Sequence, residues 1–73
     1  MPASSAFVLR AVNRSGDVVF YTGRAGNGWV DSDRREAFSF TDLTHARGRA
    51  VWFNRYSEVH GCWFVAVPRE GEP

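Results

Sequence analysis

Only one stretch of this 73-residue chain has the spacing of an amphipathic helix, and it limits what the chain can fold into. Thr41 and Asp42 supply N-cap side chains, and we expect a helix over about 42–55 with Gly48 as its weak point. The apolar stripe of this helix consists of Leu43, Ala46, Ala50 and Phe53. Because one helix can cover only one face of a sheet, a second apolar sheet face would need another cover.

The first two strands are expected to form a hairpin. Phe7–Val12 and Val18–Thr22 are rich in β-branched and aromatic residues. The residues between them suit a three-residue loop, Arg14–Gly16, that ends in a left-handed glycine and places Val12 opposite Val18. A two-residue loop would shift this register by one position.

Shorter segments follow the hairpin. The three glycines of Gly23–Gly28 predict a loop, and acidic capping residues before Arg34–Ala37 predict one helical turn. Phe38–Phe40 alternates apolar and polar residues, which favours a short third strand. Cys62–Val67 is expected to form the last strand.

These elements predict an α+β domain in the order β-β-β-α-β, with a small, mainly antiparallel sheet and one helix packed on one face. A fourth strand parallel to the third would require a right-handed connection through the helix. We expect residues 7–67 to form the single domain, with a flexible N-terminus at 1–6 and a flexible C-terminal tail at 68–73.

The charge balance limits the class of partner. Nine arginines and no lysines oppose eight acidic residues, for a formal net charge of +1, so a broad positive field for nucleic acid or anionic lipid is not expected. The longest apolar run is far below the roughly 18 residues needed to span a bilayer. Cys62 cannot form an internal disulfide, and Met1–Ala6 lacks signal-peptide features, so we expect a cytoplasmic protein.

A combination of short motifs points to a group of relatives. The chain holds Tyr21–Gly26 (YTGRAG), Gly28-Trp29, Glu36–Phe40 (EAFSF), Ala50 and Phe53-Asn54. Together these residues resemble a group of short uncharacterised proteins found in bacterial and prophage genomes, over about residues 8–54. The resemblance implies a phage-borne or horizontally mobile accessory protein and implies no activity.

No combination of residues predicts catalysis, a cofactor or a metal site. A three-ligand zinc site could be drawn from His45, His60 and Cys62, but structural zinc usually takes four ligands at other spacings. The Cys62 thiol with His60 as base is disfavoured, because a cysteine on an apolar strand is usually inert. Capping explains the acidic cluster of Asp31, Asp33 and Glu36. We therefore expect a protein that is not an enzyme.

Two arginine-containing features allow anion binding. The loop Gly23–Gly28 could cradle a phosphate, with Arg24 as a possible anion contact, but it matches neither dinucleotide nor Walker spacing and a plain connecting loop is favoured. A basic stripe for nucleic acid could also form, diluted by nearby carboxylates, from Arg34, Arg35, Arg47, Arg49 and Arg55.

The most informative feature is the excess of large apolar side chains over the cover available. Strand alternation assigns one set to the helix side: Phe7, Leu9, Ala11, Tyr21, Phe40 and Phe64. The reverse face would then present Val8, Val12, Val18, Phe20, Trp63 and Val65. Such a patch is larger than a solitary small domain normally exposes. The alternative is that Trp29, Trp52 or residues 2–6 fold over it.

The sequence therefore predicts a binding module that forms a homodimer or docks an unknown protein through this reverse face. The predicted partner-binding residues are Val8, Arg10, Val12, Phe20, Trp63 and Val65. A less favoured reading is single-stranded nucleic acid bound on the same face, with Phe20 and Trp63 as stacking platforms and Arg10 as the phosphate or base contact. No membrane partner is expected.

Overall fold

The computed structural model describes residues 6–69. Strands alternate with short 3-10 helices (η) in the first half of the chain, and the second half holds the main helix. The elements are β1 (Phe7–Val12), β2 (Val18–Tyr21), η1 (Gly26–Trp29), β3 (Val30–Asp31), η2 (Arg34–Glu36), α1 (Leu43–Asn54), α2 (Ser57–His60) and β4 (Trp63–Pro68).

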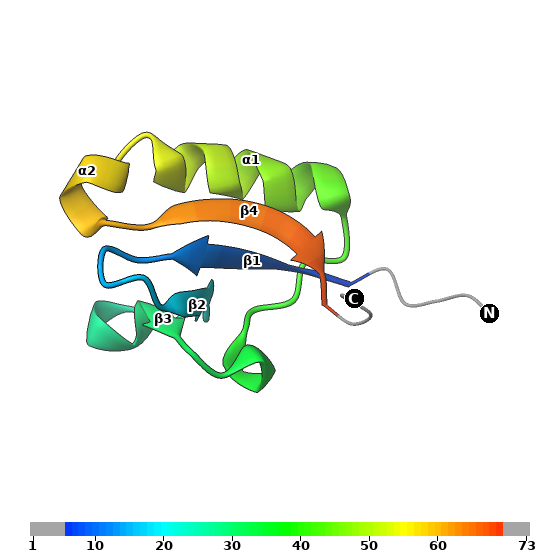
Figure 1. The fold of residues 1–73 in the computed structure, drawn as a ribbon. Helices are drawn as coiled ribbons and strands as arrows, with labels where there is room; N and C mark the ends of the chain where they lie inside the picture. The colour runs from blue at the N-terminus through cyan, green and yellow to red at the C-terminus, as the bar shows by residue number, and fades with distance from the viewer. Residues whose placement is uncertain (1–5, 70–73) are drawn as a thin grey trace.

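The sheet is antiparallel throughout, in the order β3-β2-β1-β4. The helix α1 lies along one face of the sheet, above β4 and β1 in Figure 1. The predicted α+β class is therefore confirmed. The last strand pairs antiparallel with β1 at the sheet edge, so no parallel crossover occurs.

The hairpin has the predicted register, with Val12 opposite Val18. The Asn13 side-chain oxygen accepts hydrogen bonds from the backbone N–H groups of Ser15 and Asp17, at 3.0 and 2.9 Å. Gly16 has φ of +88°, a value that glycine adopts without strain. The local turn signals were sufficient to predict this loop.

The predicted third strand at Phe38–Phe40 is wrong. The strand that pairs with β2 is β3, and Phe40 makes only an isolated bridge with Phe7. The chain turns away after β2 at Gly23, where φ is +83° and an added Cβ would lie 2.8 Å from the Phe38 ring. Since β2 stops there, the place beside Phe7 is open, and Phe40 fills it with two backbone hydrogen bonds of 2.7 and 2.8 Å.

The helical predictions hold. The carboxylate of Asp42 caps α1 by accepting from the Thr44 N–H at 3.2 Å, and Asp33 caps η2 by accepting from the Arg35 N–H at 2.9 Å. The expected exit loop instead contains the short helix α2, which ends at Gly61 with φ of +79°.

The chain ends are only partly described. β4 continues through Pro68, one residue beyond the predicted strand, and the Arg69 N–H donates to the Ala6 carbonyl at 3.0 Å. Ala6 and Arg69 are thus hydrogen-bonded at the edge of the domain. The rest of the predicted flexible segments, 1–5 and 70–73, lies outside the described residues.

The main core lies between α1 and the sheet, where the sequence placed it. Trp29 packs beside it, with its ring 5.5 Å from Phe53 and 5.7 Å from Phe64 between centroids. The buried members of this core are Leu9, Ala11, Val19, Phe40, Ala46, Ala50, Phe53, Cys62 and Phe64.

Candidate interaction surface

The sheet face opposite α1 has two halves with different environments. The first, which we call the covered half, contains Val8 and Phe20, with 0% and 5% of their surface exposed. The sequence predicted both residues to be open to a partner, and that prediction is wrong. They form a second small core with Ala37, against which Val67 packs.

The segment that contains η2 provides this cover. Ala37 is buried against the sheet, and the Arg34 guanidinium lies over the Phe20 ring, 5.2 Å from its centroid. Arg69 fixes the segment to the end of β4 by donating from Nη1 to the Ala37 carbonyl at 2.9 Å. Arg34 Nη1 in turn donates to the Arg69 carbonyl at 2.8 Å. A second apolar layer therefore exists, built from a loop rather than a helix.

The other half of the face, which we call the open half, keeps its large side chains exposed. Register places Trp63, Val12 and Val18 in one row across β4, β1 and β2, with exposed fractions of 60%, 52% and 46%. Val65 and Arg10 lie opposite each other in the next row, and Val65 is 40% exposed. Arg10 is half-buried there. Four of the six predicted partner-binding residues thus share this open half.

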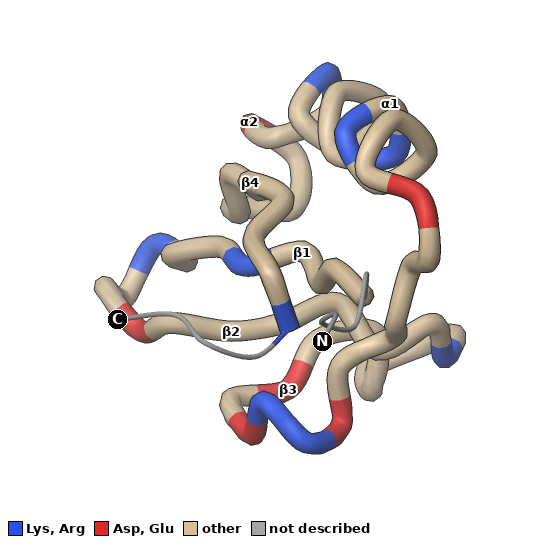
Figure 2. Tube along the Cα trace, turned by 90° about the vertical axis from the view of Figure 1, so that its right-hand side faces the viewer, with Lys and Arg blue, Asp and Glu red and all other residues tan. Residues whose placement is uncertain are grey.

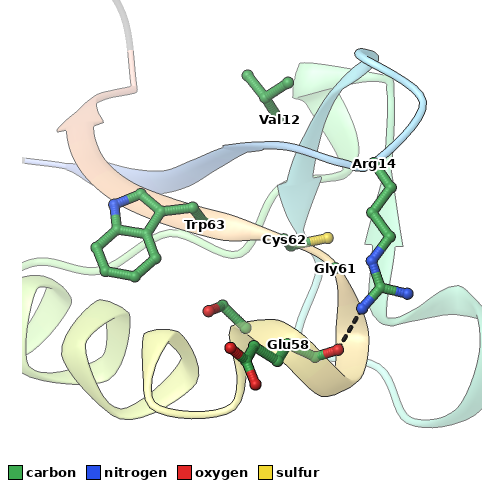
Figure 3. Close-up of a pocket in the computed structure, with 7 residues that line it drawn as sticks. Val12, Arg14, Glu58, Gly61, Cys62 and Trp63 are labelled. Atoms are coloured by element: carbon green, nitrogen blue, oxygen red, sulfur yellow. Dashed lines mark hydrogen bonds between the residues drawn. The ribbon is translucent and has the colours of Figure 1, made fainter.

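Trp63 lies between two shallow hollows at the edge of the sheet. On one side it borders a hollow of about 320 Å³ that Val12, Cys62 and Arg14 also line, and Arg14 donates to the Glu58 carbonyl there (Figure 3). On the other side the ring borders a hollow of about 300 Å³ on α1, lined by Val51, Asn54 and Arg55. The exposed apolar surface therefore continues from the open half around the edge of β4.

The edge of β4 is itself partly closed to strand pairing. The Asn54 side chain imitates a neighbouring strand: its Nδ2 donates to the Phe64 carbonyl at 3.0 Å and its Oδ1 accepts from the Phe64 N–H at 2.8 Å. Two residues past Ala66, Pro68 has no N–H to offer. An added strand would therefore find little of this edge available. No pattern in the sequence predicts this role of Asn54, although the residue belongs to the motif combination.

The two tryptophans that the sequence suggested as covers for this sheet face lie elsewhere in the structure. Trp29 packs in the main core on the helix side, and Trp52 lies on the outer surface of α1, 47% exposed. Residues 2–5 of the third expected cover are outside the described residues. Within residues 6–69, the open half keeps the exposures given above.

Arg24, the possible anion contact, is engaged by carboxylates. Its Nη1 lies 3.0 Å from Glu36 Oε1 and its Nη2 lies 3.8 Å from Asp31 Oδ2. The Thr22 hydroxyl holds the same loop by donating to the Gly28 carbonyl and accepting from the Arg24 N–H. The contacts of Arg24 are therefore those of a residue that ties the loop to η2. Much of the motif combination has this kind of structural role.

The residues considered for metal binding or nucleophilic catalysis are not brought together. His45 lies in the first turn of α1 against Phe40, whereas His60 ends α2. His60 Nδ1 accepts from the Cys62 N–H at 3.2 Å, so Nε2 carries the hydrogen and donates to the Phe53 carbonyl at 2.8 Å. Burial raises the pKa of the Cys62 thiol, with a smaller opposing effect of Arg14. Among the described residues, no three His, Cys, Asp or Glu side chains form a metal-binding group.

The expected basic stripe divides between two surfaces. Arg34 and Arg35 belong to η2, where Arg35 pairs with Asp33 at 3.1 Å. Hydrogen bonding to Arg35 lowers the pKa of the Asp33 carboxyl. The remaining members, Arg47, Arg49 and Arg55, belong to α1 or its C-terminal cap.

No family model, curated protein or solved structure matches this chain. None of the helices described in residues 6–69 is sufficiently long and apolar to cross a membrane.

Proposed function

We propose that the chain is a small, non-enzymatic binding module that forms a homodimer through the open half of its sheet. One observation carries the proposal: the row Trp63–Val12–Val18 is exposed on a domain that already uses a loop to cover the other half of the same face. A domain of this size has a small core, and association is a common way to bury the remainder.

The composition of the open half fits the centre of an interface. It contains a tryptophan and an arginine, the residue types that dominate binding energy, and three valines. Arg10 is the only charged residue in the two rows, and its long side chain can carry the charge to the rim. Charged residues are depleted at interface centres in the same way.

The shape of the row favours a second copy as the partner. Trp63 lies at the β4 end and the smaller Val18 at the β2 end, on either side of Val12. In a two-fold pairing about an axis parallel to the strands, the large end of one copy lies over the small end of the other. Face-to-face packing is also the mode left available, since Asn54 and Pro68 restrict pairing along β4.

The area available sets the expected affinity. A standard interface takes roughly 800 Å² from each partner, about one sixth of the chain's 4805 Å² of accessible surface. The first row crosses three strands about 4.8 Å apart, and the second, about 7 Å away, adds only Val65 and Arg10 because Phe20 is covered, so the patch is at most about 14 Å on a side. We therefore expect a weak dimer, with a dissociation constant in the micromolar range.

Sedimentation equilibrium over a series of micromolar concentrations tests the proposal. The wild type is expected to move from monomer to dimer across the series, and Trp63→Ser is expected to stay monomeric. Trp52→Ser is the matched control, because Trp52 is a similarly exposed tryptophan on the far side of α1, and its dimerisation should equal that of the wild type. A wild type that remains monomeric at the highest concentration, or a Trp63→Ser variant that still dimerises, contradicts the proposal.

The less favoured reading, single-stranded nucleic acid on the sheet face, has weaker support. Phe20 is buried beneath Arg34, so Trp63 is the one predicted stacking platform that is exposed. A single ring beside half-buried Arg10 is a poor match to the paired aromatics of sheet-based nucleic-acid binders.

The cellular setting of the proposed dimer comes from the sequence. The single cysteine, Cys62, has no partner in the chain for a disulfide, which favours a reducing compartment such as the cytoplasm. The resemblance to short prophage-encoded proteins favours an accessory role in a mobile genome. The cytoplasmic location and the accessory role are parts of this proposal.

A further inference from the structure

Two exposed aromatic rings lie next to each other on the outer surface at the C-terminal end of α1. Trp52 and Tyr56 are 47% and 48% exposed, and their ring centroids lie 5.4 Å apart. The Arg49 guanidinium lies 5.7 Å from the Trp52 ring centroid on the same helix. These residues are separated by three and four positions, so they share one solvent-facing stripe. Neither the main core nor the proposed dimer surface uses this stripe.

Charge is segregated onto this helix. From Leu43 to Ser57 the chain has three arginines, Arg47, Arg49 and Arg55, and no acidic residue. The other six arginines face eight acidic residues, a formal −2 for the remainder of the chain. Figure 2 shows only basic positions along α1 itself, with the acidic N-cap Asp42 directly before it, whereas both signs alternate around β3. The near-neutral total therefore hides a positive surface.

Arginines flank the central tryptophan. Arg49 precedes Trp52 by three residues and Arg55 follows it by three, so both lie within a helical turn of the indole. A guanidinium pairs with phosphate through two parallel hydrogen bonds and also stacks on planar groups. Helical spacing thus places one arginine a turn before the exposed ring and one a turn after it, and the Arg55 side chain also lines the hollow beside Trp63.

A glycine opens a hollow beside this ring. His45, Gly48, Arg49 and Trp52 line a space of about 300 Å³ on the helix surface. An added Cβ at Gly48 would meet no atom within 4 Å, so the missing side chain, not crowding, leaves the space empty. Glycine at this position weakens α1. The hollow thus gives a planar group access to Trp52 from the N-terminal side.

We propose that this surface binds single-stranded nucleic acid, with a base stacked at Trp52 and its flanking phosphates held by Arg49 and Arg55. Base-on-aromatic stacking between basic side chains is the usual basis of sequence-tolerant single-strand binding. An acidic peptide would use the same charges, but its carboxylates have no flat face to stack in the hollow that Trp52 and His45 line, whereas a nucleobase has one. The exposed rings therefore favour the nucleic acid.

The inference does not rest on the proposed dimer. The tryptophan for single-strand binding is on the outer surface of α1, and the one for dimerisation projects from β4. The two tests therefore have independent outcomes. Substitution of Trp63 is expected to change the oligomeric state, and substitution of Trp52 is expected to change the affinity for the oligonucleotide.

Fluorescence anisotropy of a labelled oligothymidylate, at low and at physiological salt, tests the inference. The wild type is expected to saturate at micromolar protein, and two or three phosphate contacts should weaken binding roughly tenfold between 50 and 200 mM salt. Polyglutamate of similar charge and free thymidine monophosphate are the competitors. If thymidine monophosphate competes as well as unlabelled oligothymidylate at the same nucleotide concentration, the surface binds free nucleotides. If it competes more weakly, the surface binds a strand.

Three variants assign binding to the α1 surface. Trp52→Ala should weaken binding roughly fivefold or more, since stacking on one ring carries that much affinity. Arg49→Ala should weaken binding and flatten its salt dependence by about one phosphate contact. Arg35→Ala is the charge-matched control, because Arg35 is exposed on η2 across the sheet from α1, and its affinity should stay within about twofold of wild type.

Gly48→Leu separates binding from folding. Leucine is a far better helix former than glycine, so the thermal midpoint should rise, while its side chain fills the hollow and weakens binding. A substitution that damaged the fold would instead lower both the thermal midpoint and the affinity for the oligonucleotide. The inference is overturned if the oligonucleotide does not saturate at low salt, if polyglutamate competes equally well, or if Trp52→Ala and Gly48→Leu bind like the wild type.

Discussion

The covered and open halves of the sheet face are built from the same strands and differ in what lies over them. Val8 and Val12 are two rows apart on one side of β1, yet Val8 is fully buried and Val12 is half exposed. The pattern of alternation that places them on this face is identical. The difference in their exposure arises from Ala37, which packs against Val8 and Phe20 but not against Val12.

This comparison teaches that strand alternation predicts which face a side chain occupies, but not whether that face is covered. Cover depends on where a connection with little regular structure is fixed. Here Arg69 and Arg34 fix it through side-chain bonds to backbone carbonyls at the Val8 end. The Trp63 end has no such segment among the described residues, and there the surface remains available.

The largest expected effect separates the two halves by stability. Phe20→Ala should lower the free energy of unfolding by about 3–5 kcal/mol, because it removes a buried ring and leaves a cavity. Trp63→Ala should change it by less than about 1 kcal/mol, because that ring is mostly exposed. Urea denaturation at protein concentrations below the dimer range measures both.

Equal costs for the two substitutions would contradict the division of the face. A small effect at Phe20 would mean that η2 does not cover it tightly in solution. A large effect at Trp63 would mean that a further part of the chain packs over the open half.

The parts that could be predicted from sequence rest on local signals. The Asn13–Gly16 turn chemistry and the helical stripe of α1 depend on residues close together in the chain. The turn is confirmed, and so are three of the four stripe residues, since Leu43 is only partly buried. The assignment of Leu9 and Phe64 to the helix side follows from alternation and is also confirmed.

The missed features depend on contacts between distant residues. The strand at Phe38–Phe40 had a suitable pattern, but the turn at Gly23 gave the place beside β2 to a two-residue strand instead. The burial of Phe20 under Arg34 and the bond of Asn54 to Phe64 join residues 14 and 10 positions apart, without a periodic signal. Four of the six predicted partner-binding residues therefore lie together in the open half, and the boundary between the open and covered halves could not be predicted from local patterns.

An intermediate effect is expected at the edge that adjoins the open half. Asn54→Ala removes both hydrogen bonds to Phe64 and leaves a backbone N–H and C=O without partners, which should cost about 1–3 kcal/mol. Asn27→Ala, at an exposed position in η1, is the control and should stay within about 0.5 kcal/mol of wild type. Urea denaturation gives both values, and light scattering should show that only Asn54→Ala promotes self-association along the freed edge. An unchanged stability would mean that water replaces the amide there.

The smallest expected effect concerns Cys62, which lies at the open end of the sheet but points into the main core. Burial disfavours the thiolate and raises the pKa of this thiol above 9.0, its value in an unfolded chain, with a smaller opposing influence of Arg14. The unfolded chain then loses the proton first as pH rises, so the stability that the buried thiol contributes is complete below pH 9 and declines as the pH rises through the folded pKa. The free energy of unfolding should fall over this alkaline range more in the wild type than in Cys62→Ala, which lacks the titrating group. Iodoacetamide should likewise alkylate the folded chain at pH 8 more slowly than the chain in urea. Equal alkylation rates would show that iodoacetamide reaches the main core through the open end of the sheet. The difference between the two halves would then include the packing of the core beneath them as well as their surface exposure.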